Sequence, residues 1–321
     1  MMSRMLALIL AIMLAVPAWA EDSVSFRLNW YMGGAHAPFF LGKERGFYRD
    51  VGIDLTINEG RGSANTAQVV AAGTDTFGLA DSSSVMRLIS KDAGIRTVMS
   101  LLNTSAFGVI SLAETNIRTP KDLEGKKLAI TAGDALTQLF PAFAGFNKLD
   151  MSKITLLQID PAGKIVALLE KRVDAILGGL DEQYFIVKQK GFTPAGMAFA
   201  KNGANTVGLT ILTQDATITG KPDLVRRFVA ATQKSWEAAK ADPDAAVAAL
   251  LKAKPSLDFE SQKNQLVTDI PNIWSPATEG KPIGWGALSD WEATEKLLKQ
   301  YGNLETDKTA SAFFTNDFLP K

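Results

Sequence analysis

The stretch Ile57–Val70, INEGRGSANTAQVV, joins a strand-like run to a helix-like run through Gly-x-Gly. Alternating apolar residues at 53–57 precede the glycines, and a helical pattern begins near Ser63. A short apolar run follows and ends in Asp81. This order of strand, glycine turn, helix, strand and acidic residue outlines a dinucleotide-binding fingerprint. The pattern has two interpretations. The glycine turn and the helix start could bind a dinucleotide, or they could bind another ligand in the same way.

The alternation of strands and helices continues on both sides of this stretch. It restarts after the turn-rich segment 119–127 as a second, smaller unit of about 90 residues. Beyond Lys221 the pattern is almost entirely helical. Such alternation predicts an α/β protein with mostly parallel sheets covered on both faces.

Two similar strand-like runs bracket the second unit, FGVISLA at 107–113 and VGLTILT at 207–213. If both cross between lobes, they form a hinge beside a cleft. The sequence therefore predicts two lobes joined by two crossing strands. The first domain is expected to be discontinuous (21–110 and 210–321), and the second to span 111–209. Ligands are expected in the cleft, at the carboxyl ends of the parallel strands of both lobes.

Residues 1–20 read as a cleavable signal peptide. A short basic start precedes a dozen apolar residues at 5–16, too few to span a bilayer comfortably, and Ala18-Trp19-Ala20 offers a cleavage site. The chain has no cysteine, so a lipid-modified cysteine at the cleavage point is excluded. We expect an exported protein without an anchor, located in the periplasm.

Composition narrows the function further. The absence of cysteine excludes disulfides and thiol catalysis, and a single histidine makes a transition-metal site improbable. Lys+Arg and Asp+Glu both number 34, a balance that does not favour nucleic acid or an anionic membrane as partner. We expect no cofactor, a small-molecule ligand and a monomer. About 300 mature residues exceed what one core supports, in keeping with two lobes.

Several short segments together resemble one family. They are LNW (28–30), HAPFF (36–40), KERGFY (43–48), GID (52–54), GRGS (60–63), VVAAG (69–73), FG (77–78), PKDLEGK (120–126) and VDA (173–175). The chain resembles the periplasmic substrate-binding proteins of ABC importers, most closely the nitrate/sulfonate/taurine and thiamine-pyrimidine-precursor binding family. The C-terminal part matches only in its helical character. The resemblance implies the periplasmic-binding-protein fold and a closing, two-lobed protein that delivers solute to a membrane permease.

The opening stretch then predicts one half of a ligand site. Backbone N–H groups at Ser63, Ala64 and Asn65 begin a helix and suit an anionic or hydrogen-bond-accepting group. The alternative is a plain turn with Ser63 as the N-cap. A dinucleotide is disfavoured because Asn65 occupies the place of the third glycine.

Aromatic and acidic residues predict the rest of the site. Trp30 and Tyr31 end a strand at the cleft and Phe107 begins a crossing strand, so their rings could stack on a planar ligand. His36, the only histidine, lies near a helix start; carboxylates and one serine follow the ends of other strands. Core packing and N-capping are the alternative roles. The full candidate set is Trp30, Tyr31, His36, Ser63, Ala64, Asn65, Asp81, Ser82, Phe107, Asp134, Asp181 and Glu182.

No motif for catalysis occurs, so we expect a binding protein and not an enzyme. Enzymes related to this family depend on a cysteine-rich segment and iron, which this chain cannot supply. Arg61 is the only basic residue beside a candidate site, whereas up to four carboxylates surround it. This balance favours a planar, nitrogen-containing organic ligand, such as an aminopyrimidine thiamine precursor. The alternatives are an organic sulfonate or carboxylate at Ser63 and Asn65, or an exported enzyme using Asp81, Asp134 and Asp181 as acid and base.

Overall fold

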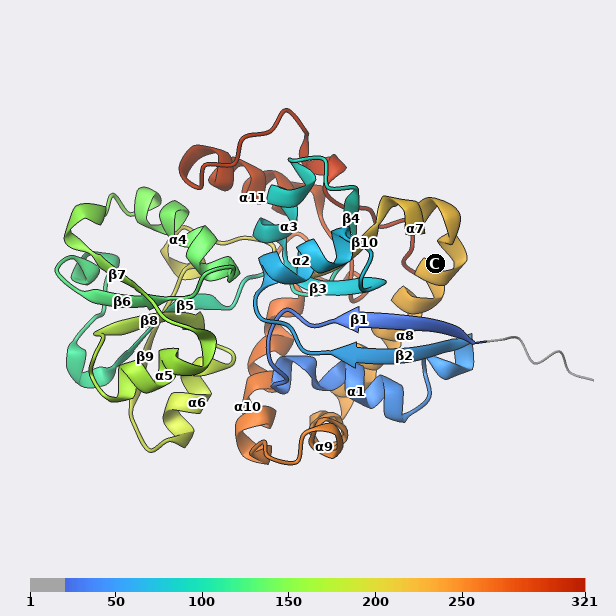
Figure 1. The fold of residues 1–321 in the computed structure, drawn as a ribbon, viewed down its shortest axis with the longest axis horizontal. Helices are drawn as coiled ribbons and strands as arrows, with labels where there is room; N and C mark the ends of the chain where they lie inside the picture. Colours follow the sequence, from blue (N-terminus) through green and yellow to red (C-terminus); the bar gives the residue numbers. More distant parts are fainter. Residues whose placement is uncertain (1–20, 321) are drawn as a thin grey trace, which may run out of the picture.

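Two five-stranded sheets organise the chain in the computed structural model, which describes residues 21–320 (Figure 1). The predicted signal peptide, residues 1–20, lies outside the described residues. The first sheet has the order β2-β1-β3-β10-β4 and the second the order β7-β6-β8-β5-β9. We call the parts built around them the first and second lobes. The two-lobed α/β fold predicted from the sequence is confirmed.

The strands follow the predicted runs closely, with one addition. The first sheet contains β1 (Asp22–Arg27), β2 (Ile53–Asn58), β3 (Phe77–Asp81), β4 (Ile95–Ser100) and β10 (Leu209–Gln214). The second contains β5 (Phe107–Leu112), β6 (Lys127–Ile130), β7 (Thr155–Gln158), β8 (Ala175–Gly179) and β9 (Pro194–Ala198). Strand β9 has no counterpart in the sequence analysis, because a segment PAGMA lacks the β-branched and aromatic residues that mark strands.

Helices cover both faces of each sheet. In the first lobe they are α1 (Ala37–Glu44), α2 (Ser63–Ala71), α3 (Ser82–Ile89), α7 (Asp215–Gly220), α8 (Pro222–Ala241), α9 (Pro243–Ala253), α10 (Phe259–Asp269) and α11 (Leu288–Tyr301). In the second lobe they are α4 (Ala135–Phe146), α5 (Pro161–Leu169) and α6 (Gln183–Gln189). The described part has no helix with the length and apolar character needed to cross a membrane.

The sheets are mixed, which corrects the prediction of mostly parallel sheets. In the first sheet β1 lies parallel to β2 and β3, but β10 runs antiparallel to β3 and β4. In the second, β6 lies parallel to β7 and β8, but β5 runs antiparallel to β8 and β9. Each antiparallel strand is the one that the chain forms directly after it changes lobe, and both occupy the fourth position of their sheet.

The crossings lie just ahead of the strands predicted to make them. Strand β5 pairs only within the second sheet and β10 only within the first, so neither strand is shared between the sheets. The chain passes between the lobes at 101–106 and 203–208. These segments run side by side: Gly208 N–H donates to the Leu102 carbonyl, and Leu102 N–H to the Leu209 carbonyl. The prediction that the strands themselves cross between the lobes was wrong, because an apolar pattern marks a strand but not the point where the chain changes lobe. The predicted division into domains (21–110 with 210–321, and 111–209) stays a prediction.

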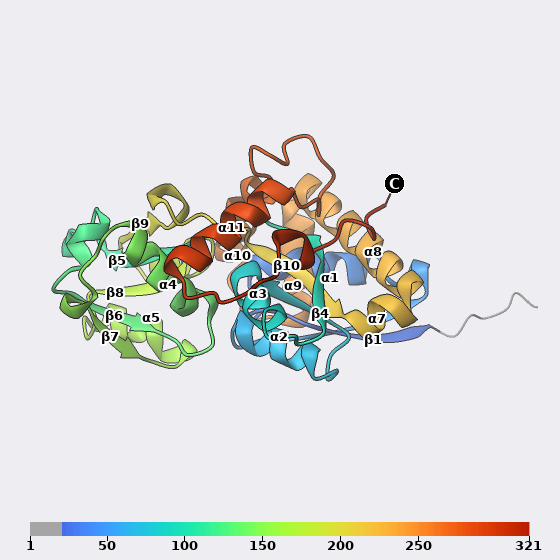
Figure 2. The same ribbon diagram turned by 90° about the horizontal axis from the view of Figure 1, so that it is seen from above.

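The lobes touch on two unlike sides. On one side α11 and α3 of the first lobe pack on α4 of the second, and a single apolar cluster containing Val85, Phe140, Trp291 and Leu297 spans both lobes (Figure 2). Arg87 Nη2 adds a hydrogen bond of 3.1 Å to the Gln138 carbonyl. On the other side α10 meets α6, and the carboxyl groups of Asp269 and Asp181 face each other there. The candidate site lies between these two sides.

Candidate functional site

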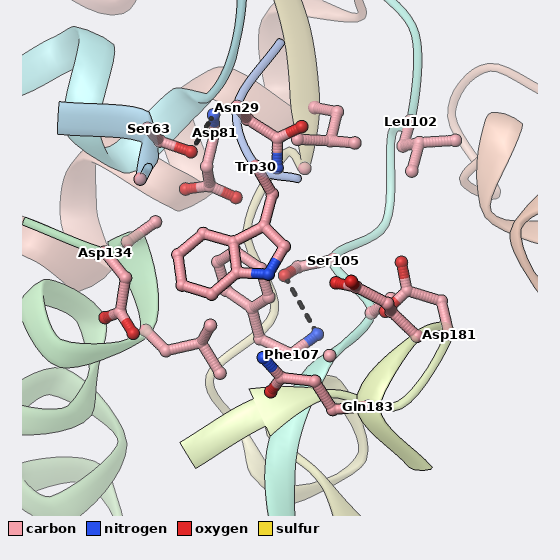
Figure 3. A pocket seen from close by; sticks show the side chains of 18 of the residues that line it. Asn29, Trp30, Ser63, Asp81, Leu102, Ser105, Phe107, Asp134, Asp181 and Gln183 are labelled. Atoms are coloured by element: carbon pink, nitrogen blue, oxygen red, sulfur yellow. Dashed lines mark hydrogen bonds between the residues drawn. The ribbon is translucent and has the colours of Figure 1, made fainter. Parts of the chain in front are cut away.

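A cavity of about 60 Å³ lies between the lobes (Figure 3). Seven of the predicted residues line it: Trp30, Ser63, Asp81, Phe107, Asp134, Asp181 and Glu182. The wall also contains residues that were not predicted from the sequence, among them Asn29, Ser105, Lys164 and Gln183. Residues that follow strands of both lobes therefore share one cavity, as expected for ligand sites in such folds.

The two glycines of the opening stretch bring backbones together. A β-carbon on Gly60 would collide with the Leu28 carbonyl, and Gly60 N–H donates to the Trp30 carbonyl at 3.0 Å. Gly62, at φ 127°, lies so close to Gly133 of the second lobe that a side chain would collide with the Gly133 carbonyl. Close approach of two chain segments, rather than room for a pyrophosphate, is thus what this Gly-x-Gly provides.

The start of α2 is already engaged in hydrogen bonds. Ser63 Oγ accepts a hydrogen bond from Asp81 N–H at 3.0 Å, and Ala64 N–H donates to the Gly133 carbonyl across the cleft at 3.3 Å. Asn65 is exposed and does not line the cavity, because it lies two residues, about 200° of helix rotation, beyond Ser63. Of the three N–H groups predicted to meet a ligand, the contact with Gly133 engages that of Ala64.

Two aromatic rings form the centre of the cavity wall. The Trp30 indole projects into it from the loop after β1, with the Phe107 ring beside it at the start of β5 (Figure 3). Trp30 is 9% exposed, so it is covered on most sides yet reaches the cavity. Tyr31 packs against Trp30 with ring centroids 5.7 Å apart but does not line the cavity.

Asp81 presents a buried carboxylate oxygen to the cavity. Its Oδ1 accepts hydrogen bonds from Ser83 N–H at 3.0 Å and Ser83 Oγ at 2.6 Å, which makes Asp81 the N-cap of α3. Its Oδ2 has no hydrogen-bond partner within residues 21–320. Burial raises the pKa of Asp81 to about 7. An acceptor buried without a partner costs free energy, which a hydrogen-bond donor on a ligand would recover.

Asp134 and Lys164 form a buried ion pair in the second lobe. Lys164 Nζ lies 3.2 Å from Asp134 Oδ2, and both side chains are almost completely buried. Asp134 also caps α4 by accepting from Thr137 N–H, and the Lys164 ammonium lies 5.7 Å from the centre of the Trp30 ring. This cation corrects the expectation that Arg61 is the only basic residue near the site; Arg61 itself is exposed.

Two adjacent carboxylates follow β8 on the second lobe. Burial raises the pKa of Asp181 to about 6 and that of Glu182, which also faces the Asp181 charge, to about 8. Gln183, the first residue of α6, lines the same wall, and its Oε1 is buried without a partner in the described part of the chain. Acceptors therefore outnumber cations around the cavity.

His36 and Ser82 support the wall from behind. His36 Nδ1 accepts from Gly33 N–H at 3.1 Å, so its Nε2 carries the proton and donates to Asn29 Oδ1 at 2.9 Å. This bond leaves the Asn29 amide N–H groups for the cavity. Ser82 Oγ donates to the Val207 carbonyl in the second crossing segment. Neither residue lines the cavity, so His36 and Ser82, which were predicted to contact the ligand, lie behind the residues that form the wall.

His36 is expected to stay neutral throughout the range from pH 5 to 8. Burial lowers its pKa to about 4, and protonation would remove the acceptor that holds Gly33. Because the chain has one histidine, a protein without a histidine tag gives one pair of imidazole signals in NMR. These signals should keep their chemical shifts from pH 8 to pH 5; a midpoint near 6.5 would contradict the assignment.

The described residues contain no group of three or more histidine or acidic side chains placed to hold a metal ion. The carboxylates around the cavity are spread over separate strand ends instead. The site as built suits hydrogen bonding and stacking.

Comparisons with known proteins agree with the fold. A family model described as NMT1/THI5 like matches residues 34–246. The chain is 22% identical over 308 residues to the riboflavin-binding protein RibY of Chloroflexus aurantiacus, covering 93% of this chain and 86% of that protein. It is 21% identical to the 4-amino-5-hydroxymethyl-2-methylpyrimidine phosphate synthase of Legionella pneumophila, covering 94% and 93% of the two chains.

A solved structure gives the same architecture. The alkanesulfonate-binding protein SsuA from Xanthomonas axonopodis pv. citri, bound to MOPS, superposes with a TM-score of 0.73 at 17% identity, covering 92% of this chain and 99% of that one. At this identity the likeness establishes the fold, which is that of the periplasmic binding proteins.

Proposed function

Because the chain belongs to the NMT1/THI5-like family, we propose that it is the periplasmic solute-binding component of an ABC importer. Its ligand is a small, planar, nitrogen-containing organic molecule, such as an aminopyrimidine thiamine precursor. The lobes close around the ligand, and the closed protein delivers it to a membrane permease. The fold, the interlobe cavity and the name of one relative, a riboflavin-binding protein, support this proposal.

The unpartnered Asp81 Oδ2 carries the argument for the ligand's chemistry. It lies in the cavity wall at 1% exposure for the whole residue, where water cannot easily replace a partner. Asp181 and Glu182 add carboxylates to the same wall. Amino groups and protonated ring nitrogens are the donors that complement such a wall. Trp30 and Phe107 supply faces on which a flat ring can stack.

Ligand entry requires the lobes to separate further than they do in this structure. The cavity volume of about 60 Å³ is well below the roughly 150 Å³ that accommodates benzene in a protein interior. The polar α6–α10 side is where separation costs least, because the α11 side buries a shared apolar cluster. Capture thus consists of opening, stacking of the ring against Trp30 and partial reclosure.

Asp81→Asn is expected to weaken binding of a formylaminopyrimidine by about 10- to 100-fold. The amide oxygen still caps α3, but an NH2 group takes the place of the accepting Oδ2, so a charge-assisted hydrogen bond worth roughly 1.5–3 kcal/mol is lost. Calorimetric titration of wild type and variant measures the change. Asp160→Asn is the matched control, since Asp160 is also an aspartate N-cap, of α5, but is exposed and outside the cavity.

The same titration series separates the ligand classes. Taurine, an alkanesulfonate, nitrate and an aromatic carboxylate are tested beside the formylaminopyrimidine. Binding of the anions alone, with Asp81→Asn leaving their affinity unchanged, would replace this proposal by an anion binder. Lys164 is the observation that favours this second candidate, but its charge is already paired with Asp134.

We also propose that the chain binds its ligand without converting it. Several relatives are named synthases, and Asp81, with a pKa of about 7, has the properties of a general acid or base. The proposed binding role rests on the absence of cysteine and of any catalytic motif in the sequence. Mass spectrometry of a bound ligand recovered after prolonged incubation distinguishes the two, because an enzyme returns a changed molecule.

A further inference from the structure

Asp269 is a buried acid on the face of the first lobe that meets the second. It is the last residue of α10, its exposure is 0%, and neither side-chain oxygen accepts a hydrogen bond from a donor group among residues 21–320. Helix α10 packs on α6 of the second lobe. Asp269 does not line the cavity, so ligand contact does not account for its burial.

The group that faces Asp269 is another carboxyl group, Asp181 of the second lobe. The two carboxyl groups lie within hydrogen-bond contact of each other. Two carboxylates offer only acceptors, so this contact is favourable when one of them carries a proton and donates it to the other. Asp181, unlike Asp269, also lines the cavity. The pair therefore joins the lobes and reaches the ligand site at the same time.

The surroundings supply little positive charge to the pair. Glu182 is the nearest further acid, and a β-carbon on Gly33 would lie 3.7 Å from its Oε1, so it too faces the first lobe. The Asn272 amide, which donates to the Thr268 carbonyl, lies near Asp269 and lowers its pKa slightly, while Lys164 and Lys254 act at longer range on Glu182. Lys164 is paired with Asp134, and Lys254 with Glu59. His36, behind Gly33, is neutral because burial lowers its pKa to about 4.

We propose that Asp269 is a positioning residue for ligand capture, which acts through Asp181 by sharing one proton with it when the lobes close. The shared proton holds the Asp181 carboxyl group in the cavity wall and links the lobes on the polar side of the cleft. Opening exposes both carboxyl groups to water, where they release the proton.

The direction of the pH dependence follows from this exchange. Burial raises the pKa of Asp181 to about 6 and that of Asp269 well above its ordinary value, whereas both are near 4 in water. The closed form thus binds more protons than the open form above about pH 4. By linkage, closure is favoured at low pH and becomes less favourable as the pH rises through and above 6.

The experiment measures the distance between the lobes without any ligand, so that this proposal and the proposed binding function can fail separately. The chain contains no cysteine, and Gln189 on α6 and Asn264 on α10 are exposed on opposite sides of the cleft. Changing both to cysteine allows labelling with a short-range pair of fluorophores. The protein also carries Asp81→Asn and Glu182→Gln, so that these two acids of the cleft, whose pKa values burial also raises, do not contribute to the pH response. Energy transfer is then measured from pH 5 to 8.5.

Transfer efficiency is expected to fall as the pH rises above about 6. Adding Asp269→Asn should abolish this pH response and keep transfer high, since an amide donates to the Asp181 carboxylate without a titrating proton. Asp181→Asn should have the same effect, and circular dichroism verifies that each variant folds. Asp258→Asn, at the exposed start of the same helix, should leave the response intact. A transfer efficiency independent of pH before Asp269 is changed, or a pH response that survives Asp269→Asn, would overturn the proposal.

Discussion

Lys164→Met is expected to lower the free energy of unfolding by about 3–5 kcal/mol, the range measured when one partner of a buried ion pair is removed. The Lys164 side chain is 0% exposed and lies 3.2 Å from Asp134 Oδ2. Methionine fills the space of the lysine stem but leaves the Asp134 carboxylate buried without its cation. Thermal and denaturant unfolding of the ligand-free protein measure the loss.

A second substitution shows whether the unpaired charge is the cause. In Lys164→Met with Asp134→Asn, no charge remains, and the amide oxygen can still accept the hydrogen bond from Thr137 N–H that begins α4. Most of the lost stability should therefore return. Lys153→Met is the matched control for an exposed ion pair and should cost under about 1 kcal/mol. A double variant as unstable as Lys164→Met alone would show that packing, not charge, decides the effect.

Trp30→Ala is expected to weaken binding of an aromatic ring ligand by about a hundredfold or more. Buried aromatic side chains at the centre of binding sites contribute about 2–4 kcal/mol, and Trp30 lies at the centre of this wall with Phe107 beside it (Figure 3). Isothermal titration with the formylaminopyrimidine measures the loss. Trp30→Phe should retain part of the affinity, because it keeps an apolar ring at the same position.

Trp274→Ala provides the comparison for Trp30→Ala. Trp274 is half-buried outside the cavity, where its indole N–H donates to the Lys281 carbonyl at 2.9 Å. Its removal should lower stability but leave affinity unchanged. If Trp30→Ala bound the ring ligand within threefold of wild type, stacking on Trp30 would not be part of recognition.

Strand ends were the part of the site that the sequence could predict. Asp81, Asp134 and Asp181 each follow an apolar run, and in an α/β fold such positions gather at one edge of the sheet. Trp30 was found for the same reason, although β1 itself ends at Arg27 and the following loop carries the ring. The fold class was predictable because alternating strands and helices leave few architectures.

Residues in the interior of helices could not be identified in this way. Lys164 occupies an ordinary position in α5, where a lysine usually faces solvent, and only the packing of α5 against the cleft reveals it as buried. Asp269 ends a helix far along the chain, and nothing local connects it to Asp181. Asn65 was placed in the site from the glycine turn, but the helix rotation directs it to solvent.

The insertion of β10 between β3 and β4 has a consequence for the order of folding during synthesis. Strands β3 and β4 are complete by residue 100, but the strand that joins them spans 209–214. While the intervening second lobe is made, each of them has an edge whose N–H and C=O groups lack a neighbour. Such edges pair readily with other chains, so the nascent protein carries an aggregation-prone intermediate for more than a hundred residues of synthesis. The sheet of the first lobe can be completed only after the second lobe has been synthesised. A chain truncated before β10 would leave the edges of β3 and β4 unpaired.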